Sequence, residues 1–213
     1  MKKHGIELVC FDLNKTLLNE TTWDDLNLAL GLSREEDQRY IDEFAAGEIT
    51  YREWTKILLD LYLQRGRADR QTILNSILRY TYRPGAKELV YYLKQQGYHL
   101  ALISGSLDLL IDKIAQELEI KLAAANNTFV FNEQDQLIDI ITLNEDDVAK
   151  VRHLQKFCDQ LNITMGQVVC VGDGDNDIKL FEQTKHGITF TGSKIAGSAW
   201  RTVNQLSDIK NIL

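Results

Sequence analysis

The sequence predicts an α/β fold, with a Rossmann-like parallel sheet as the core and a small helical cap inserted into it. Apolar strand patterns alternate with amphipathic helix patterns over most of the 213 residues, which favours a parallel sheet covered by helices. The alternation stops between residues 21 and 83, where the pattern is nearly all helical and no convincing strand is present. We therefore expect a core domain of residues 1–20 and 84–213 and a cap domain of residues 21–83.

Short, nearly continuous apolar runs predict the central strands, because strands buried on both faces carry few polar residues. These runs are Ile6–Phe11, Leu100–Ile103 and Val168–Val171, and weaker candidates are Leu122–Ala125 and Gly187–Phe190. Residues 127–141 alternate between apolar and polar around a polar turn at 132–136. This pattern predicts a β-hairpin.

Amphipathic stretches between the strands predict the helices of the core. They are Ala86–Gln96, Leu107–Leu118, Val148–Leu161 and Ile178–Gln183. Within the cap, Ser33 with Glu36 and Thr50 with Glu53 have the spacing of capping boxes, each of which opens a helix. Pro84, the only proline, is followed by Gly85 and marks the return of the chain to the core.

Composition narrows the class of partner. The chain has 24 basic and 31 acidic residues and a net charge of −7, which argues against nucleic acid or an anionic membrane. No stretch approaches the length of a membrane span or of a signal sequence. Cys10, Cys158 and Cys170 are widely spaced and predicted to be free, which favours a reducing, cytoplasmic setting. The sequence does not indicate an oligomeric state.

Two aspartates follow strands that are expected to be neighbours. Asp12 comes directly after the first strand, and Asp173 follows the strand Val168–Val171. Because ligands of open α/β sheets bind beyond the carboxyl ends of the strands, we expect both carboxylates at one site. Oxygen ligands suit Mg²⁺, so the sequence predicts a magnesium site formed by Asp12, Asp173 and the backbone carbonyl of Asn14.

Four motifs in order along the chain carry a family resemblance. They are Asp12-Leu13-Asn14-Lys15-Thr16, Ser104 after an apolar strand, Lys150, and Gly172-Asp173-Gly174-Asp175-Asn176-Asp177. This pattern resembles the haloacid dehalogenase superfamily, and within it the phosphoserine-phosphatase-like branch. The resemblance covers nearly the whole chain and implies a phosphatase whose cap closes over the site.

The resemblance also implies residue roles. Asp12 would be the nucleophile that forms an aspartyl-phosphate, and Lys150 would neutralise charge, with Lys156 as a less favoured competitor. Asp177 would hold a metal-bound water or pair with Lys150, which adds it to the metal-site candidates Asp12, Asn14 and Asp173. The residues expected to hold the phosphoryl group are Ser104, the amides of Gly105 and Ser106 at the start of a helix, Thr16 and Asn176.

Asn14 departs from the family pattern, which has an aspartate there as general acid and base. An amide does neither, and general acid–base catalysis contributes roughly 10²- to 10⁴-fold. We therefore expect a Mg²⁺-dependent phosphomonoester phosphatase weakened at this step, acting on a small-molecule phosphate ester. Asn14 is compatible with an engineered trap, a natural variant with a replacement base, or a pseudoenzyme. The alternative functions are a silent phosphoryl-ligand-binding or regulatory protein, and a phosphotransferase to an acceptor other than water.

Substrate choice is expected to depend on the cap. The family positions for a substrate-binding glutamate and arginine hold Thr21, next to Glu20, and Leu58, with Lys56 nearby, so phosphoserine is a doubtful substrate. The cap aromatics are candidates either for an apolar pocket or for helix packing: Trp23, Tyr51, Trp54 and Tyr62. His99, His153 and His186 have no ligand spacing, and we expect structural or surface roles for them.

Overall fold

The computed structural model describes residues 3–143 and 145–213. Its core is a seven-stranded sheet with the order β4-β3-β2-β1-β5-β6-β7. The strands are β1 (Leu8–Phe11), β2 (His99–Leu107), β3 (Leu122–Phe131), β4 (Leu137–Thr142), β5 (Val168–Val171), β6 (Gly187–Phe190) and β7 (Arg201–Val203). All neighbouring strands are parallel except β3 and β4. The predicted α/β fold is confirmed.

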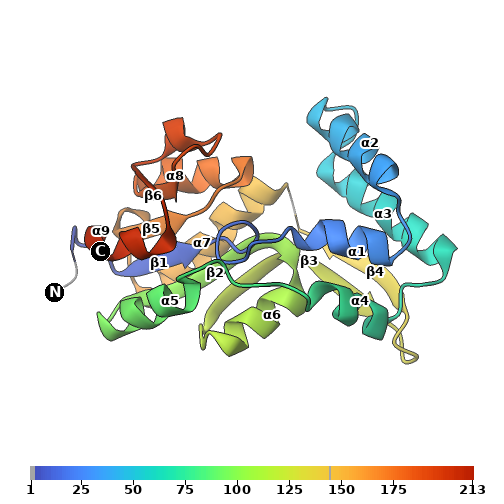
Figure 1. Cartoon of the computed structure of the whole chain (residues 1–213), viewed down its shortest axis with the longest axis horizontal. Coiled ribbons are helices and arrows are strands. Elements are labelled where there is room, and N and C mark those ends of the chain that lie inside the picture. The colour runs from blue at the N-terminus through green and yellow to red at the C-terminus, as the bar shows by residue number, and fades with distance from the viewer. Residues whose placement is uncertain (1–2, 144) are drawn as a thin grey trace.

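Helices cover both faces of the sheet (Figure 1). They are α5 (Ala86–Gln95), α6 (Asp108–Glu117), α7 (Asp146–Leu161), α8 (Ile178–Thr184) and the short C-terminal α9 (Ile209–Ile212). Successive side chains of a strand point to opposite faces, so Val9 and Phe11 pack with α5 and α6, whereas Leu8 and Cys10 pack with α7 and α8. Burial on both faces explains why β1 and β5 are continuously apolar.

The order of the strands reverses at the centre of the sheet, beside β1. From β1 the chain continues to β2 on one side, and later returns to β5 on the other side of β1. Phe11 pairs in register with both Leu102 and Val171, so β1, β2 and β5 all end at the same edge. This is the switch point at which an open α/β sheet binds its ligand.

The structure corrects one expectation about the segment after β2. Gly105 and Ser106 do not open a helix; they lie in β2, which continues to Leu107, and α6 begins at Asp108. The strand continues because β3 remains beside it, with a shift in register between Ser104 and Leu107 and renewed pairing of Leu107 with Asn127. The short edge strand β7 was not predicted, since most of its side chains are exposed and leave no apolar pattern.

The predicted hairpin is confirmed as β3 and β4, which pair antiparallel. The weaker strand candidate Leu122–Ala125 is the first part of β3, which continues without interruption into the hairpin. In the turn, the side chain of Asn132 accepts hydrogen bonds from the backbone of Gln134 and Gln136. The polar turn is therefore stabilised locally, as its sequence suggests.

Residues between β1 and α5 form four helices and contribute no strand to the described sheet. These helices are α1 (Thr22–Ala29), α2 (Arg34–Ala45), α3 (Tyr51–Arg65) and α4 (Arg70–Ile77). Both predicted capping boxes are present, at the starts of α2 and α3. Figure 1 shows α2 at the outer corner of this group, and α2 contains no buried residue, whereas α3 contacts β4. We refer to α1–α4 as the cap helices.

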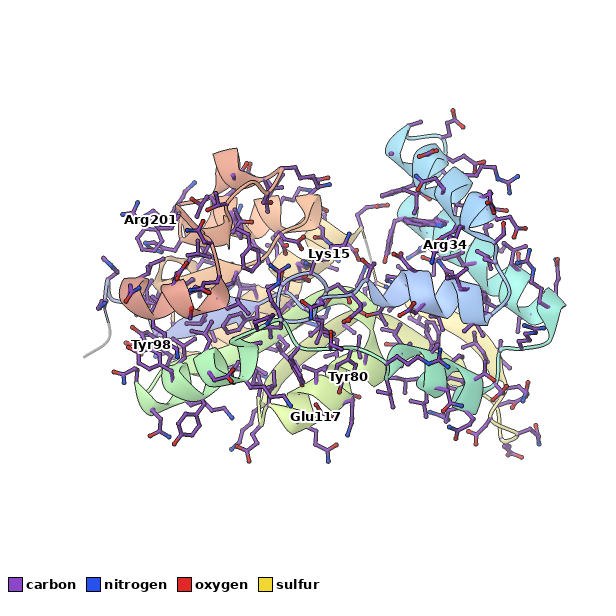
Figure 2. All side chains as sticks on the ribbon, viewed as in Figure 1. Lys15, Arg34, Tyr80, Tyr98, Glu117 and Arg201 are labelled. Carbon is purple, nitrogen blue, oxygen red and sulfur yellow. The ribbon has the colours of Figure 1, made fainter. Side chains whose placement is uncertain are left out.

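Two linkers connect the cap helices to the core and run side by side. Arg83 donates its backbone N–H to Leu17 at 2.8 Å, and Asn19 donates to Thr81 at 3.0 Å. Figure 2 shows Tyr80 close to Glu117, where the returning linker meets α6. The hydroxyl of the neighbouring Tyr82 donates to Glu117 at 2.9 Å.

The cap helices also rest on the hairpin. Leu137 donates its backbone N–H to Ala68 at 2.8 Å, and Arg70 donates its own to Asp135 at 2.8 Å. The Arg70 guanidinium and the Asp135 carboxylate add an ion pair at 2.8 Å. The cap helices are thus attached at the linkers and at the hairpin tip. Within residues 3–143 and 145–213, no helix is both long and apolar enough to cross a bilayer.

Candidate active site

Asp12 follows β1 directly and lies at the sheet edge where β1, β2 and β5 end. Its backbone N–H donates to Val171 at 2.9 Å, so the β1–β5 pairing fixes its main chain. Its side chain is 9% exposed, and its Oδ1 accepts a hydrogen bond from the Lys150 ammonium at 2.8 Å. No described residue donates to its other oxygen, Oδ2. That oxygen is the one available for chemistry.

Lys150 joins the two acidic segments of the site. It lies on α7 with 1% of its surface exposed, and its Nζ also donates to Asp177 at 2.6 Å and to the amide oxygen of Asn176 at 3.2 Å. Burial works against the ammonium, but the carboxylates of Asp12 and Asp177 outweigh it and raise the pKa of Lys150. Lys150 is therefore a fixed cation. Lys156, the competitor weighed from sequence, is exposed.

The acidic groups outnumber the nearby buried cation. Asp12, Asp173 and Asp177 each bring one carboxylate oxygen to within 4.8 Å of the others. Burial raises the pKa of Asp177, and the charge of Asp12 adds to this against the opposing effect of Lys150. Burial also raises the pKa of Asp173, again helped by Asp12. One ammonium does not compensate three carboxylates, so the cluster retains excess negative charge.

This donor set fits a divalent cation. Oxygens bound to Mg²⁺ at about 2.1 Å lie about 3 to 4 Å apart, so ligand atoms within 4.8 Å of one another need only small adjustments. Figure 2 shows Lys15 on the loop after β1, between the core and the cap helices. Its positive charge opposes the rise in the pKa of Asp173 but does not cancel it. The position of the Asn14 carbonyl relative to an ion stays a prediction.

Glycines in the loop after β5 permit the close approach of Asp177. A Cβ at Gly172 would lie 2.2 Å from Asp177 Oδ2, so a larger residue there would displace this carboxylate. The same oxygen accepts the backbone N–H of Gly174 at 3.2 Å. Both oxygens of Asp177 are thus occupied, one by Lys150 and one by the loop. Asp175 points outward and pairs with Lys194.

Buried hydroxyl groups lie at the end of β2 and in the loop after β1. Ser104 and Ser106 are buried, and the Ser106 backbone N–H donates to Ser104 Oγ at 3.3 Å. The hydroxyls of Thr16 and Ser106 are buried without a hydrogen-bond partner among the described residues. Buried polar groups of this kind are normally satisfied, which fits a site that binds an oxygen-rich ligand.

Asn14 is oriented by the first cap helix. Its side-chain oxygen accepts hydrogen bonds from the Thr22 hydroxyl at 2.5 Å and from the Thr22 backbone N–H at 3.3 Å. Neither of these hydrogen bonds involves its Nδ2. Thr22 begins α1, so the side chain two residues after Asp12 is held by the cap.

Other cap residues reach the end of β2. The Trp23 indole N–H donates to the Gly105 carbonyl at 3.3 Å, and Asn127 of β3 donates to the same carbonyl at 2.9 Å. Asn127 Nδ2 also donates to the hydroxyl of the buried Tyr51 at 2.9 Å. Sequence reasoning missed Asn127, although two consecutive asparagines inside a strand, Asn126 and Asn127, are an unusual polar signal.

The remaining candidates lie away from this region. Tyr62 is fully buried and its hydroxyl donates to Asn27, so it belongs to the packing of the cap. Trp54 stacks on Phe44 with ring centroids 5.2 Å apart. Leu58 is buried in the apolar core, and Lys56 is exposed. Thr21 precedes α1 as its N-cap residue and makes no side-chain cap hydrogen bond.

The histidines play no part in the site. His99 is exposed, and His186 packs edge-on against Trp200. Burial lowers the pKa of His153, which lies on α7. The three cysteines are free and buried, as the sequence suggested.

Comparisons with known proteins agree with this geometry. The family model described as haloacid dehalogenase-like hydrolase matches residues 6–183. A phosphoserine phosphatase of Methanocaldococcus jannaschii is 28% identical over 97% of this chain and 96% of its own length. One of Albidiferax ferrireducens is 31% identical over 89% of this chain and 81% of its own length.

Solved structures give the same result. A substrate-bound phosphoserine phosphatase complex superposes with a TM-score of 0.82 and 26% identity, and covers 100% of both chains. A phospho-aspartyl intermediate analogue of phosphoserine phosphatase gives 0.81 and 26%, covering 98% of this chain and 99% of the other. The chain therefore belongs to the haloacid dehalogenase-like hydrolases, in their phosphoserine-phosphatase-like branch.

Proposed function

We propose that this protein is a Mg²⁺-dependent phosphomonoester phosphatase that acts through an aspartyl-phosphate on Asp12 and turns over slowly because of Asn14. The observation that carries the proposal is the Lys150 ammonium held between Asp12 and Asp177, beside the carboxylate of Asp173. Phosphoryl transfer depends mainly on positioning and charge neutralisation, and this cluster supplies both.

In the first step, Asp12 Oδ2 attacks phosphorus, the new O–P bond forms, and the bond to the leaving oxygen breaks. Lys150 holds Oδ1 and orients the carboxylate. In the second step, water attacks the phosphorus of the aspartyl-phosphate, which releases inorganic phosphate and regenerates the carboxylate. Splitting one difficult displacement into two is the general benefit of a covalent nucleophile.

Asp12 and Asp173 would hold the cation, with Asp177 and the Asn14 carbonyl completing its surroundings. When bound, Mg²⁺ reduces the repulsion between the anionic nucleophile and the anionic phosphoryl group. The proposed phosphoryl ligands are the hydroxyls of Ser104 and Thr16, the amides of Gly105 and Ser106, and the side chain of Asn176.

With Asn14, neither step has the general acid or base that an aspartate at this position would supply. An amide neither protonates a departing alkoxide nor accepts a proton from the attacking water. Aryl phosphates have good leaving groups and need little protonation in the first step, so we expect them to be the best test substrates. Hydrolysis of the aspartyl-phosphate should then limit turnover.

For the physiological substrate we propose a small phosphate monoester. The similar proteins are named phosphoserine phosphatases, so phosphoserine belongs in any substrate screen. This chain has Thr21 and Leu58 where the family resemblance places the amino-acid-binding glutamate and arginine, which argues for a different leaving group. Free, buried cysteines support the inference of a reducing, cytoplasmic location.

The proposal is tested by phosphate release from an aryl phosphate, from alkyl phosphates and from phosphoserine, with Mg²⁺ and with EDTA. We expect slow, Mg²⁺-dependent release from the aryl ester, which Asp12→Asn abolishes. Asp175→Asn is the matched control, because Asp175 lies in the same loop as Asp173 but is exposed, and its rate should change by no more than about two-fold.

Two other outcomes would replace the proposal. If no phosphate is released but phosphate binds tightly in the presence of Mg²⁺, the chain is a phosphoryl-ligand-binding protein. If release is faster when an alcohol or amino acid is added as acceptor, it is a phosphotransferase.

A further inference from the structure

Asp146 is a carboxylate that the proposed reaction does not use, although it lies beside the residues that do. It is the first residue of α7, one helical turn before Lys150. Its Oδ1 accepts a hydrogen bond from Asn126 of β3, and its Oδ2 accepts one from Asn176 at 3.4 Å. A Cβ at Gly105 would lie 2.1 Å from Asp146 Oδ2, so the carboxylate is packed against the end of β2.

The same carboxylate contacts the cap. Burial raises the pKa of Asp146, and the hydroxyl of Tyr51, on α3, lies close enough to oppose this effect in part. The charge of Asp146 in turn adds to burial in raising the pKa of Tyr51. Tyr51 is 8% exposed, and its hydroxyl accepts a hydrogen bond from Asn127 at 2.9 Å, next to Asn126, which donates to Asp146.

These contacts form a continuous chain of polar groups from the cap to the nucleophile. Tyr51 accepts from Asn127, and the neighbouring Asn126 donates to Asp146. Asp146 also accepts from Asn176 Nδ2, and Asn176 Oδ1 accepts from Lys150, which holds Asp12. Because an asparagine has one donor end and one acceptor end, the carboxylate of Asp146 fixes which end of Asn176 faces Lys150.

We propose that Asp146 is a positioning residue that couples closure of the cap, through Tyr51, to the orientation of Asn176 and Lys150. The expected effect on kcat rests on the proposed function, whereas the positioning of Asn176 and Lys150 does not. When the cap moves away, Asp146 loses the Tyr51 hydroxyl and Asn176 is held less firmly. Positioning of this kind matters, because small displacements of catalytic groups are costly in rate.

Asp147 offers a matched control. It is also an acid in the first turn of α7, so it has the same favourable interaction with the helix dipole. Its carboxylate pairs with Lys179 at 2.7 Å, and both side chains are partly exposed. Asp147→Asn therefore removes an equivalent charge without touching the cap or Asn176.

The test is a double-mutant cycle with Tyr51→Phe and Asp146→Asn, using kcat for an aryl phosphate. We expect each single variant to lower kcat about ten-fold and the double variant to be no worse than either, because both remove the same coupling. Asp147→Asn should change kcat by no more than about two-fold. KM and the midpoint of urea unfolding are measured for every variant.

A second readout needs no turnover. Binding of inorganic phosphate in the presence of Mg²⁺, measured by calorimetry, should weaken in Asp146→Asn and in Tyr51→Phe, again without further loss in the double variant. This arm still tests the coupling if the wild-type protein hydrolyses no ester and the proposed function fails. Multiplicative losses in the double variant, or an Asp146→Asn protein that behaves like Asp147→Asn, would overturn the inference.

Discussion

Asn14 stands two residues after the proposed nucleophile, and its amide oxygen is already bound by Thr22 of the first cap helix. A carboxylate in the same place would accept the same two hydrogen bonds and keep one oxygen for the reacting group. The local geometry therefore suits an aspartate, and the obstacle to fast turnover is the chemistry of the amide.

Asn14→Asp should raise turnover of alkyl phosphates by roughly 10²-fold or more, because it restores a proton donor and acceptor at the reacting oxygen. Aryl phosphates should gain less in the first step and equally in the second. Intact mass measured after brief exposure to substrate should show a longer-lived phosphoenzyme in the protein with Asn14. Unchanged rates for alkyl substrates would mean that residue 14 is not at the proton-transfer position.

Residues at the ends of strands were predictable, whereas residues placed by the cap were not. Asp12 and Asp173 follow apolar runs, and parallel strands bring such ends together regardless of the intervening sequence. Thr22 reaches the site only because α1 lies beside the loop after β1, and Asp146 only because the start of α7 packs against the end of β2, and no local pattern encodes either arrangement. The case of Lys150 is intermediate, since the family resemblance indicated it and its burial between two carboxylates is known only from the structure.

At the scale of elements, the existence of the strands was easier to predict from the sequence than the residues at which they end. Val168–Val171 was predicted to the residue, because both flanks are polar or flexible. The end of β2 was missed because pairing with β3 extends it beyond Ser104, and that pairing is long-range. The capping boxes of α2 and α3 were predicted correctly because their signal lies within four residues.

Packing of α8 on the sheet leads to a prediction about β6. A Cβ at Gly187 would lie 2.1 Å from the ring of Phe181, which is 2% exposed. Gly187→Ala should therefore lower the free energy of unfolding by about 1–3 kcal/mol through overpacking, measured by urea denaturation. Gly197→Ala is the control, because a Cβ there has no neighbour within 4 Å. Equal midpoints for the two variants would contradict this account of the contact.

The stability of the whole molecule depends on pH through the site, because burial and the charge of Asp12 raise the pKa of Asp177 and of Asp173. An acid whose pKa is raised by folding binds more protons in the folded state than in the unfolded state. Stability then falls as pH rises from the unfolded pKa through the folded one. Lys150 does not alter this trend near neutrality, since its raised pKa affects stability only in the alkaline range.

In EDTA, the free energy of unfolding should fall between about pH 4 and about pH 6 more steeply for the wild type than for Asp177→Asn, by on the order of 1 kcal/mol. Comparing the two proteins removes the contributions of carboxyl groups that do not interact with Asp177. Adding Mg²⁺ should stabilise the wild type more at the higher pH, because the cation needs ionised ligands. Identical pH slopes in EDTA would show that folding does not raise the pKa of Asp177.

The attachment of the cap helices leads to an expectation about the size of the substrate. The linkers hold the cap at one place and the hairpin tip holds it at another, through Ala68, Arg70 and Asp135. Because the cap helices are attached at two places and α2 buries no residue, we expect the corner around α2 to move more readily than the attached parts. An opening confined to that corner would favour small phosphate esters over phosphorylated side chains of folded proteins.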